Sequence, residues 1–109
     1  MSGRVRVMVH VRLPDDDPDA VSRVYHRISG ELAGTEGLLS NELLRSTQDP
    51  RRCAVLSEWE SLHAFRSWEQ GAQHRDTTAP LRPYQDDAHG PSFAIYAVEA
   101  AYRSEVHQP

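Results

Sequence analysis

The sequence lacks several features that would assign it to a common functional class. It has no lysine, one cysteine and only 7% aromatic residues, and its formal net charge is -4. A single cysteine excludes an internal disulfide, so the fold tolerates a reducing compartment. An acidic chain whose arginines are spread along its length lacks the basic face that binds nucleic acid. We therefore expect no nucleic-acid partner.

Long apolar runs are absent as well. No segment approaches the roughly 20 consecutive apolar residues that a membrane-spanning helix needs. The stretch from Val5 to Val11 alternates with arginine and histidine, which is unlike the apolar centre of a signal peptide. A chain of 109 residues is long enough for one hydrophobic core and one site. We expect one cytoplasmic domain over residues 1–109, with no membrane partner and a frayed tail from 103 to 109.

The usual catalytic motifs are also missing. The sequence has no glycine-rich phosphate loop, dinucleotide fingerprint, nucleophile elbow or cysteine pair. Nucleotide-dependent chemistry and covalent serine or cysteine catalysis are therefore poorly supported. His63 and His74 do not have the spacing of metal ligands on a helix. We expect neither a metal ion nor a bound cofactor.

Residues 4–13 alternate strictly in character, which predicts a strand. Valines and a final leucine occupy one face, and the other face carries Arg4, Arg6, Met8, His10 and Arg12. The valine face requires a packed layer, whereas the second face suits water, a polar cavity or a partner sheet. Met8, His10 and Arg12 are candidate site residues if the pocket lies on that second face.

Residues 21–32 place apolar side chains three or four positions apart, which predicts an amphipathic helix ending near Gly34. The acidic run at residues 15–17, followed by Pro18, indicates the helix start, where carboxylates would cap unpaired amides. A calcium loop would need alternating oxygen ligands and a later glutamate, and neither follows here. We interpret the acidic run as a cap.

Residues 38–46 and 52–59 are extended segments on either side of a Gln-Asp-Pro-Arg turn, which predicts a hairpin. One face of the first segment carries every second residue, namely Leu39, Asn41, Leu43 and Arg45. Asn41 is thus a polar group among leucines. It either points into a pocket or, as is more common for such a residue, bonds to solvent at a sheet edge.

Residues 57–75 contain both tryptophans and a second amphipathic helix, with Ser61 as a suitable N-cap. Phe65 falls in the middle of the apolar arc and Trp68 at its rim, while Trp59 ends the preceding strand. Because these large rings converge, we expect the pocket here. From periodicity alone, the rim tryptophan is as typical of core lining as of a cavity mouth.

Residues 74–84 are largely polar and contain two prolines, which predicts one or two short turns suited to covering a site. Residues 92–102 predict the last strand. The order of strand, helix, strand, strand, helix and strand predicts an α+β ferredoxin-like sandwich, a four-stranded antiparallel sheet with helices on one face. Its open face would expose apolar surface, so we expect a homodimer in which a second sheet covers it.

Three stretches share features with a known family. Residues 9–28 form a strand that enters a helix. Residues 37–61 begin with a glycine and contain a strand with a central Ser-Asn-Glu, an Asp-Pro turn and a second strand that ends in Glu-Trp-Glu-Ser. Residues 62–75 form the helix that follows. Together they resemble the antibiotic biosynthesis monooxygenase domains of the dimeric α/β barrel superfamily.

The resemblance implies ferredoxin-like subunits that pair into a dimeric α/β barrel, with a pocket between the sheet and the helices of each subunit. Members include oxygenases that convert phenolic polyketides such as anthrones to quinones with molecular oxygen and no metal or flavin. Others are quinol monooxygenases or haem-degrading enzymes. We accordingly expect no bound cofactor, molecular oxygen as co-substrate and a small aromatic substrate. Whether a partner protein supplies reduced flavin stays open.

Individual positions narrow this choice. Trp68 matches the helix tryptophan of the anthrone oxygenases and the haem degraders, whereas many quinol-oxidising relatives have histidine there. The asparagine that anthrone oxygenases carry one helical turn earlier corresponds to Ala64, and the haem-ligating histidine falls near Thr78. These departures disfavour haem degradation and leave the base of the anthrone reaction open.

Our leading hypothesis is a cofactor-independent monooxygenase that oxidises an anthrone- or hydroquinone-type polyketide in secondary-metabolite biosynthesis. Trp68 would stack on the substrate, and His10, His74 or Asn41 would handle the phenolic proton. Arg12 would stabilise an anion. The predicted substrate-binding residues are Asn41, Arg12, Met8, Phe65 and Trp59. The alternatives are a non-redox polyketide cyclase or isomerase and a non-catalytic ligand-binding dimer.

Overall fold

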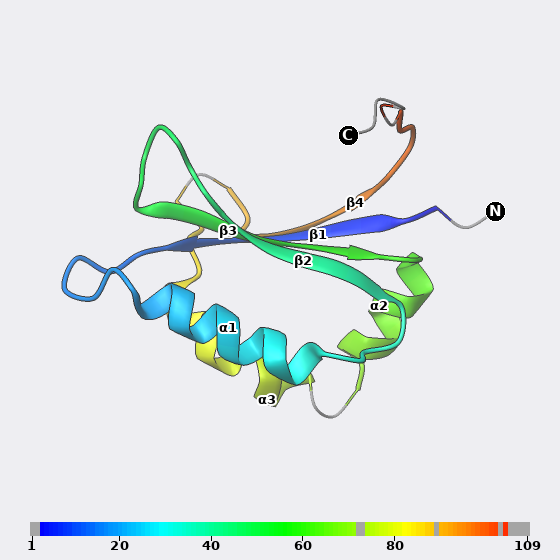
Figure 1. The fold of residues 1–109 in the computed structure, drawn as a ribbon, viewed down its shortest axis with the longest axis horizontal. Coiled ribbons are helices and arrows are strands. Elements are labelled where there is room, and N and C mark those ends of the chain that lie inside the picture. Colours follow the sequence, from blue (N-terminus) through cyan, green and yellow to red (C-terminus); the bar gives the residue numbers. More distant parts are fainter. Residues whose placement is uncertain (1–2, 72–73, 89, 103, 105–109) are drawn as a thin grey trace, which may run out of the picture.

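The structure, a computed structural model, describes residues 3–71, 74–88, 90–102 and 104. The backbone forms four strands, β1 (Val5–Arg12), β2 (Leu38–Arg45), β3 (Arg52–Trp59) and β4 (Phe93–Ala97) (Figure 1). The helices are α1 (Ala20–Leu32), α2 (Leu62–Glu69), the short α3 (His74–Thr78) and the 3-10 helix η1 (Ala79–Tyr84).

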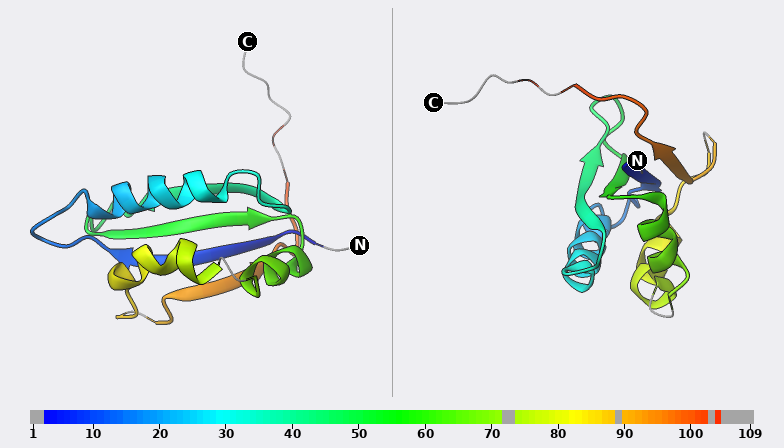
Figure 2. Two further views of the ribbon diagram at one scale, coloured as in Figure 1. Left: turned by 90° about the horizontal axis from the view of Figure 1, so that it is seen from below. Right: turned by 90° about the vertical axis from the view of Figure 1, so that its right-hand side faces the viewer.

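The strands form one antiparallel sheet in the order β2-β3-β1-β4. All helices lie on the same face of this sheet, with α1 on one side and α2 and α3 on the other, as Figure 2 shows in its end-on view. The opposite face carries no helix (Figure 1). The predicted ferredoxin-like α+β architecture is confirmed. No helix within the described ranges combines the length and the apolar character needed to cross a bilayer.

The central strand β1 shows the predicted alternation. Val5, Val7 and Val11 are buried under the helices. Arg6, Met8 and His10 lie on the open face, where Met8 pairs with Leu56 of β3 and Ala94 of β4. A strand with one buried face and one open face alternates in this way because successive side chains point to opposite sides.

The edge strand β2 departs from strict alternation. A bulge between Leu38 and Ser40 inserts one residue, so that Leu38 and Asn41 both face the helices while Leu39 is 47% exposed. The prediction that Leu39 shares a face with Asn41 is therefore wrong. A bulge places two residues opposite one, and this reverses the facing of every residue before it.

The two long helices begin differently. In α2 the Ser61 hydroxyl accepts a hydrogen bond from the Ala64 amide at 3.0 Å, which confirms the predicted cap. In α1 the N-cap is Asp19, and its side chain makes no capping bond. The predicted cap by residues 15–17 is wrong, because Asp15 pairs with Arg51 and Asp17 pairs with Arg23.

The ion pair between Asp17 and Arg23 also shifts the pKa of Arg23. The hydrogen bond from Arg23 to Asp17, together with the charge of that carboxylate, raises the pKa of the guanidinium above its usual value. Both groups lie on the surface, so the pair contributes little to stability.

The last strand is shorter than the predicted 92–102. Pairing of β4 with β1 runs from Phe93 to Ala97, after which the Val98 amide bonds to the Arg4 carbonyl at 2.8 Å. Beyond this point β1 has no residues left to pair with. Of the tail predicted to fray, all but residue 104 lies outside the described residues.

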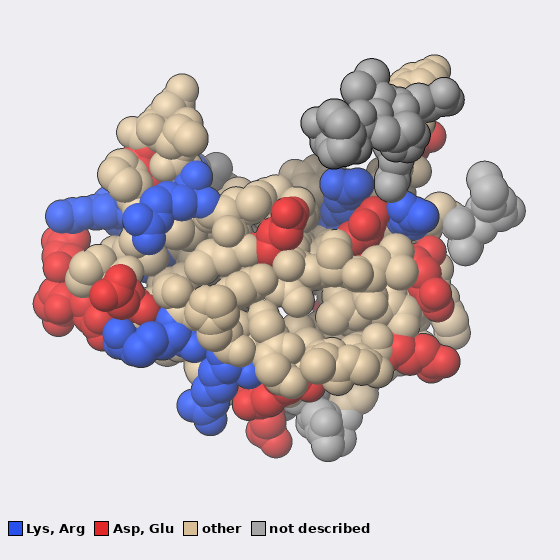
Figure 3. Space-filling model, in the orientation of Figure 1, with Lys and Arg blue, Asp and Glu red and all other residues tan. Residues whose placement is uncertain are grey.

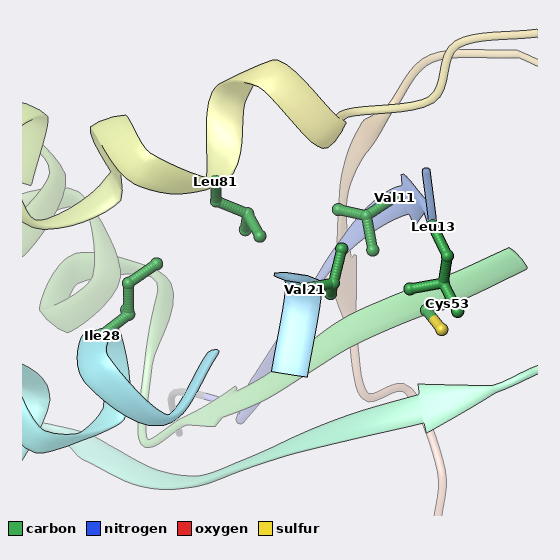
Figure 4. Close-up of a cluster of buried hydrophobic side chains, with 6 residues drawn as sticks. All are labelled: Val11, Leu13, Val21, Ile28, Cys53 and Leu81. Carbon is green, nitrogen blue, oxygen red and sulfur yellow. The ribbon is translucent and has the colours of Figure 1, made fainter. Parts of the chain in front are cut away.

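The buried side chains form two clusters and not one continuous core. The first joins β1, α1, β3 and η1, and contains Val11, Leu13, Val21, Ile28, Cys53 and Leu81 (Figure 4). The second joins β1, β3 and α2, and contains Val5, Val7, Trp59 and Phe65. The space between the two clusters holds the main cavity of the fold.

Candidate functional site

A cavity of about 320 Å³ lies between the sheet and the helices, and residues of both core clusters line it. This volume is at the lower end of the range of roughly 300–1,000 Å³ in which proteins bind small molecules. Its floor is apolar, formed by Val7, Val9, Ile28, Leu32, Val55 and Leu81. In the view of Figure 3 uncharged side chains dominate the middle of the molecule, and most charged ones lie near its edges.

Four aromatic rings form one wall of the cavity. The ring centroids of Trp59 and Trp68 lie 5.3 Å apart, those of Trp59 and Phe65 5.4 Å, and those of Phe65 and Phe93 6.2 Å. Trp59 is 1% exposed, and its indole nitrogen donates to the Ser57 hydroxyl at 2.9 Å. This bond fixes the ring. Trp68 is half-buried and also lines the cavity.

Polar side chains from α1 and β2 border the cavity on one side. The Ser29 hydroxyl donates to Asn41 Oδ1 at 3.1 Å, and the Tyr25 hydroxyl donates to the Asn41 main-chain oxygen at 3.2 Å. All three residues line the cavity. The edge strand is thereby tied to the helix, and a polar patch is placed in an otherwise apolar space.

A second polar group comes from α2, α3 and η1, which lie across the cavity from α1 (Figure 2). Its members are Glu69, Thr78, Arg82 and Gln85. Glu69 accepts a hydrogen bond from Arg66 at 2.8 Å, one turn back along α2. Arg82 makes no ion pair within the described part of the chain, and it is the one cation among the described residues that line the cavity. Its charge is available to an anionic ligand.

The structure brings together four of the predicted site residues. Trp68, Trp59, Phe65 and Asn41 all line the cavity. Periodicity left Trp68 equally suited to the core and to a cavity mouth, and its position in the structure is at the cavity. Asn41 points inward, although its strand is at the sheet edge.

Three predicted residues lie elsewhere. Met8, His10 and Arg12 are on the open face of β1, with the sheet between them and the cavity. His10 borders a smaller cavity with Arg52, Asp86 and Tyr96, and Arg12 pairs with Asp49 at 3.8 Å. The expectation that these residues share a cavity with Trp68 is wrong, because the valines of β1 occupy the face towards the helices. His74 begins α3, but its side chain lies outside the described residues.

Sequence reasoning missed several cavity residues, among them Tyr25, Ser29, Glu69 and Arg82. Ser29 and Tyr25 lie four residues apart on α1, so helical spacing does place them on one face. That signal was available in the sequence. Arg82 lies in a proline-rich turn whose path periodicity does not predict.

Ala64 corresponds to the family's helix asparagine, and it is not among the residues that line the cavity. Its methyl group packs against Gly37, where an added Cβ would stand 2.5 Å from the Ala64 Cβ. Gly37 also has a φ of +84°, which favours glycine. This corner is closely packed. Within the described ranges, no group of three or more histidine, cysteine, aspartate or glutamate residues is placed to hold a metal ion.

Two proteins of Streptomyces are similar in sequence. The chain is 30% identical over 101 residues to protein SchA of Streptomyces halstedii, which covers 93% of this chain and 27% of SchA. It is 30% identical over 92 residues to a 42.8 kDa protein in the whiE locus of Streptomyces coelicolor, covering 84% of this chain and 23% of that protein. The chain thus spans about a quarter of the length of these relatives.

Solved structures share the fold at low sequence identity. The crystal structure of SnoaB, a cofactor-independent oxygenase from Streptomyces nogalater, superposes with a TM-score of 0.71 at 15% identity, covering 98% of this chain and 100% of SnoaB. A conserved protein from Methanosarcina mazei Go1 gives a TM-score of 0.71 at 14% identity, covering 87% of this chain and 92% of that protein.

The family is established by the sequence itself. Residues 4–80, which include β1 to α3 and the start of η1, match the model of the antibiotic biosynthesis monooxygenase family. The match covers the strands and helices that build most of the cavity, including the aromatic wall from Trp59 to Trp68. The chain therefore belongs to the antibiotic biosynthesis monooxygenase family.

Proposed function

We propose that this protein is a cofactor-independent monooxygenase that oxidises a phenolic aromatic substrate, of the anthrone or hydroquinone type, with molecular oxygen. The observation that carries the proposal is an apolar cavity with a four-ring aromatic wall and one unpaired guanidinium, that of Arg82. A flat ring system would stack on Trp68, and its ionised oxygen would face Arg82. Family membership and the likeness in fold to SnoaB support this reading.

In such a reaction the substrate itself is the reductant. Loss of a proton gives an electron-rich anion, which passes one electron to oxygen. Recombination at the ring carbon then gives a peroxide. With an anthrone the O–O bond then breaks, one oxygen atom remains as the new carbonyl, and the other leaves as water with the two hydrogens of the CH₂ carbon. With a hydroquinone the water takes two hydrogens from the substrate, and the product is a hydroxyquinone. The protein's task is to stabilise the anion and exclude bulk water.

Arg82 matters more than the identity of the base. Transfer of a proton from a phenol to a carboxylate is strongly uphill, because a phenol is a much weaker acid than a carboxylic acid. Glu69 is the one carboxylate among the described residues that line the cavity, and it is an inefficient base unless the phenolate is stabilised. A guanidinium beside the phenolate oxygen lowers this cost in a partly desolvated site. We assign the phenolate to Arg82 and the proton to Glu69.

Oxygen uptake tests the proposal. The protein is incubated with a panel of anthrones and hydroquinones in the presence of a chelator and without flavin. We expect consumption of one O₂ per quinone formed from an anthrone, incorporation of one ¹⁸O atom, and a loss of turnover of about a hundredfold in Arg82→Gln. No uptake across the panel in the absence of flavin would reject the proposal. A product that forms equally well under nitrogen would instead favour a cyclase or isomerase.

We further propose that two copies pair through the open face of the sheet. That face carries a central strip of Met8, Leu56 and Ala94 in register across β1, β3 and β4, with exposed Leu44 and Tyr96 beside it. Arg4 and Arg6 both pair with Glu58 near one end of the strip, at 3.6 and 3.4 Å. An apolar strip with a polar margin has the anatomy of a subunit interface.

A further inference from the structure

Asn41 is the only asparagine in the chain, and its side chain is held in one orientation. Its Oδ1 accepts from the Ser29 hydroxyl at 3.1 Å, and its main-chain oxygen accepts from the Tyr25 hydroxyl at 3.2 Å. A hydroxyl that donates to Oδ1 leaves the Nδ2 amino group as the outward end of the amide.

The Nδ2 group has unused hydrogen-bonding capacity. It donates no hydrogen bond to any part of the chain that the structure describes. In the same part of the chain, no fully buried side-chain nitrogen or oxygen lacks a partner. Nδ2 is therefore accessible, and Asn41 lines the main cavity as well as a shallow groove at the sheet edge. The cavity side is mostly apolar, and a donor discriminates more strongly between ligands among apolar neighbours than in water.

Asn41 and Arg82 border the cavity from different sides. Asn41 lies on β2 beneath α1, and Arg82 lies on η1, which follows α3 on the other side of the cavity (Figure 2). The valines of β1 and β3 and the ring of Trp68 line the same cavity. A ligand that reaches both groups must be flat and apolar in its middle and must carry an oxygen at each end.

We propose that Asn41 recognises a second oxygen substituent of the substrate, on the edge opposite the oxygen held by Arg82, and that Ser29 positions the Asn41 amide for this contact. The inference rests on the proposed aromatic substrate. It narrows that class to fused aromatic rings that carry oxygen groups on two opposite edges. A substrate without the second oxygen would leave the amide unpaired in an apolar cavity and would bind more weakly.

Two stable probes that differ by one hydroxyl test the contact. In 6-hydroxy-2-naphthoate the carboxylate would pair with Arg82 and the hydroxyl would accept from Asn41, whereas 2-naphthoate lacks the second oxygen. Quenching of tryptophan fluorescence reports binding, because both tryptophans line the cavity. We expect the hydroxyl to increase the affinity of the wild-type protein about tenfold, the effect of one hydrogen bond between neutral groups.

Substitutions then assign that gain to single residues. Asn41→Leu is expected to remove the tenfold gain while leaving the affinity for 2-naphthoate within twofold of wild type. Arg82→Gln is expected to weaken both probes by the same factor. The matched control is Gln48→Leu, which exchanges an exposed amide in the β2–β3 turn for the same apolar side chain. It should change neither affinity.

The positioning role of Ser29 has a separate readout. Ser29→Ala should reduce the hydroxyl gain to about threefold, because the amide loses its fixed orientation, and Ser29→Thr should restore it. Both variants should bind 2-naphthoate as the wild type does. A purely structural role would weaken both probes in Ser29→Ala.

The outcomes separate this inference from the proposed oxidation. The inference is overturned if Asn41→Leu keeps the full gain in affinity from the hydroxyl. It is also overturned if neither probe binds the wild-type protein at millimolar concentration. Asn41→Ala removes the amide and introduces no hydrogen-bonding group, so it replaces Asn41→Leu if that variant fails to fold, and the same loss of the hydroxyl gain is expected. Neither probe needs to react. If the protein takes up no oxygen but Asn41→Leu still removes the affinity gained from the hydroxyl, the proposed oxidation is rejected and the proposed contact with Asn41 stands.

Discussion

The two faces of the sheet are built from the same strands but serve different purposes. On the helix side, β1 contributes Val5, Val7 and Val11, which are buried. On the open side the same strand contributes Met8 and His10, which are only half-buried. Alternation along one strand therefore separates the residues of the cavity from those of the open face, and chemistry-bearing side chains on the open face cannot reach a ligand in the cavity.

The helix side is also the incompletely filled side. The cavity of about 320 Å³ opens partly to solvent, and polar side chains such as Asn41 and Glu69 stand at its sides. A space with polar partners and an opening holds water, which a ligand can displace.

The largest effect on stability is expected for the part of the aromatic wall that also belongs to the hydrophobic core. Phe65 is 2% exposed and contacts Trp59 and Trp68, so Phe65→Ala should lower the free energy of unfolding by about 3–5 kcal/mol. Phe93 stacks on Phe65 but is 40% exposed, so Phe93→Ala serves as the control and should lower it by about 1 kcal/mol. Urea unfolding measures both. Equal losses would show that the wall is not part of the core.

The next effect concerns the open face. Leu56 belongs to the apolar strip and lies opposite Met8, so Leu56→Asp should raise the dissociation constant of the proposed homodimer at least a hundredfold. Thr47→Asp adds the same charge in the exposed β2–β3 turn and should leave association unchanged. Sedimentation velocity distinguishes monomer from dimer. A wild-type protein that stays monomeric at high micromolar concentration would contradict the proposal.

The contrast between the faces also explains which features the sequence could predict. Alternation in residues 4–13 and helical spacing in 21–32 are local patterns, and they were sufficient for the element order and the sheet topology. They do not say which face of a strand receives the helices. His10 would lie in the cavity only if its face of β1 received the helices. The valine face receives them, because burying the valines is favourable.

Features set by contacts distant in sequence were not predictable from local patterns. The bulge at Leu39 arises in pairing with β3. The aspartates before α1 pair with Arg23 and with Arg51, which lies 36 residues away, and do not cap the helix. Arg82 reaches the cavity because η1 folds back onto α1 and β1, and no spacing in the sequence indicates that approach.

A smaller effect is expected for the half-buried member of the aromatic wall. Trp68→Ala should weaken binding of 6-hydroxy-2-naphthoate about ten- to thirtyfold, because stacking on an aromatic face is lost, while unfolding should change by no more than about 2 kcal/mol. Trp68→Phe keeps a ring and should recover most of the affinity. Isothermal titration calorimetry avoids dependence on tryptophan fluorescence. An unchanged affinity in Trp68→Ala would place the ligand away from α2.

The smallest effects are expected for Val9 and His10, which are adjacent on β1 but lie on opposite faces of the sheet. They therefore compare the two faces directly. Val9 lines the cavity and His10 does not. His10→Ala should therefore leave probe affinity and the rate of any oxygen uptake within twofold of wild type. Val9→Ala enlarges the cavity floor and should weaken the probes about threefold. A large loss of turnover in His10→Ala, with probe affinity and the oligomeric state unchanged, would mean that the reaction takes place on the open face of the sheet.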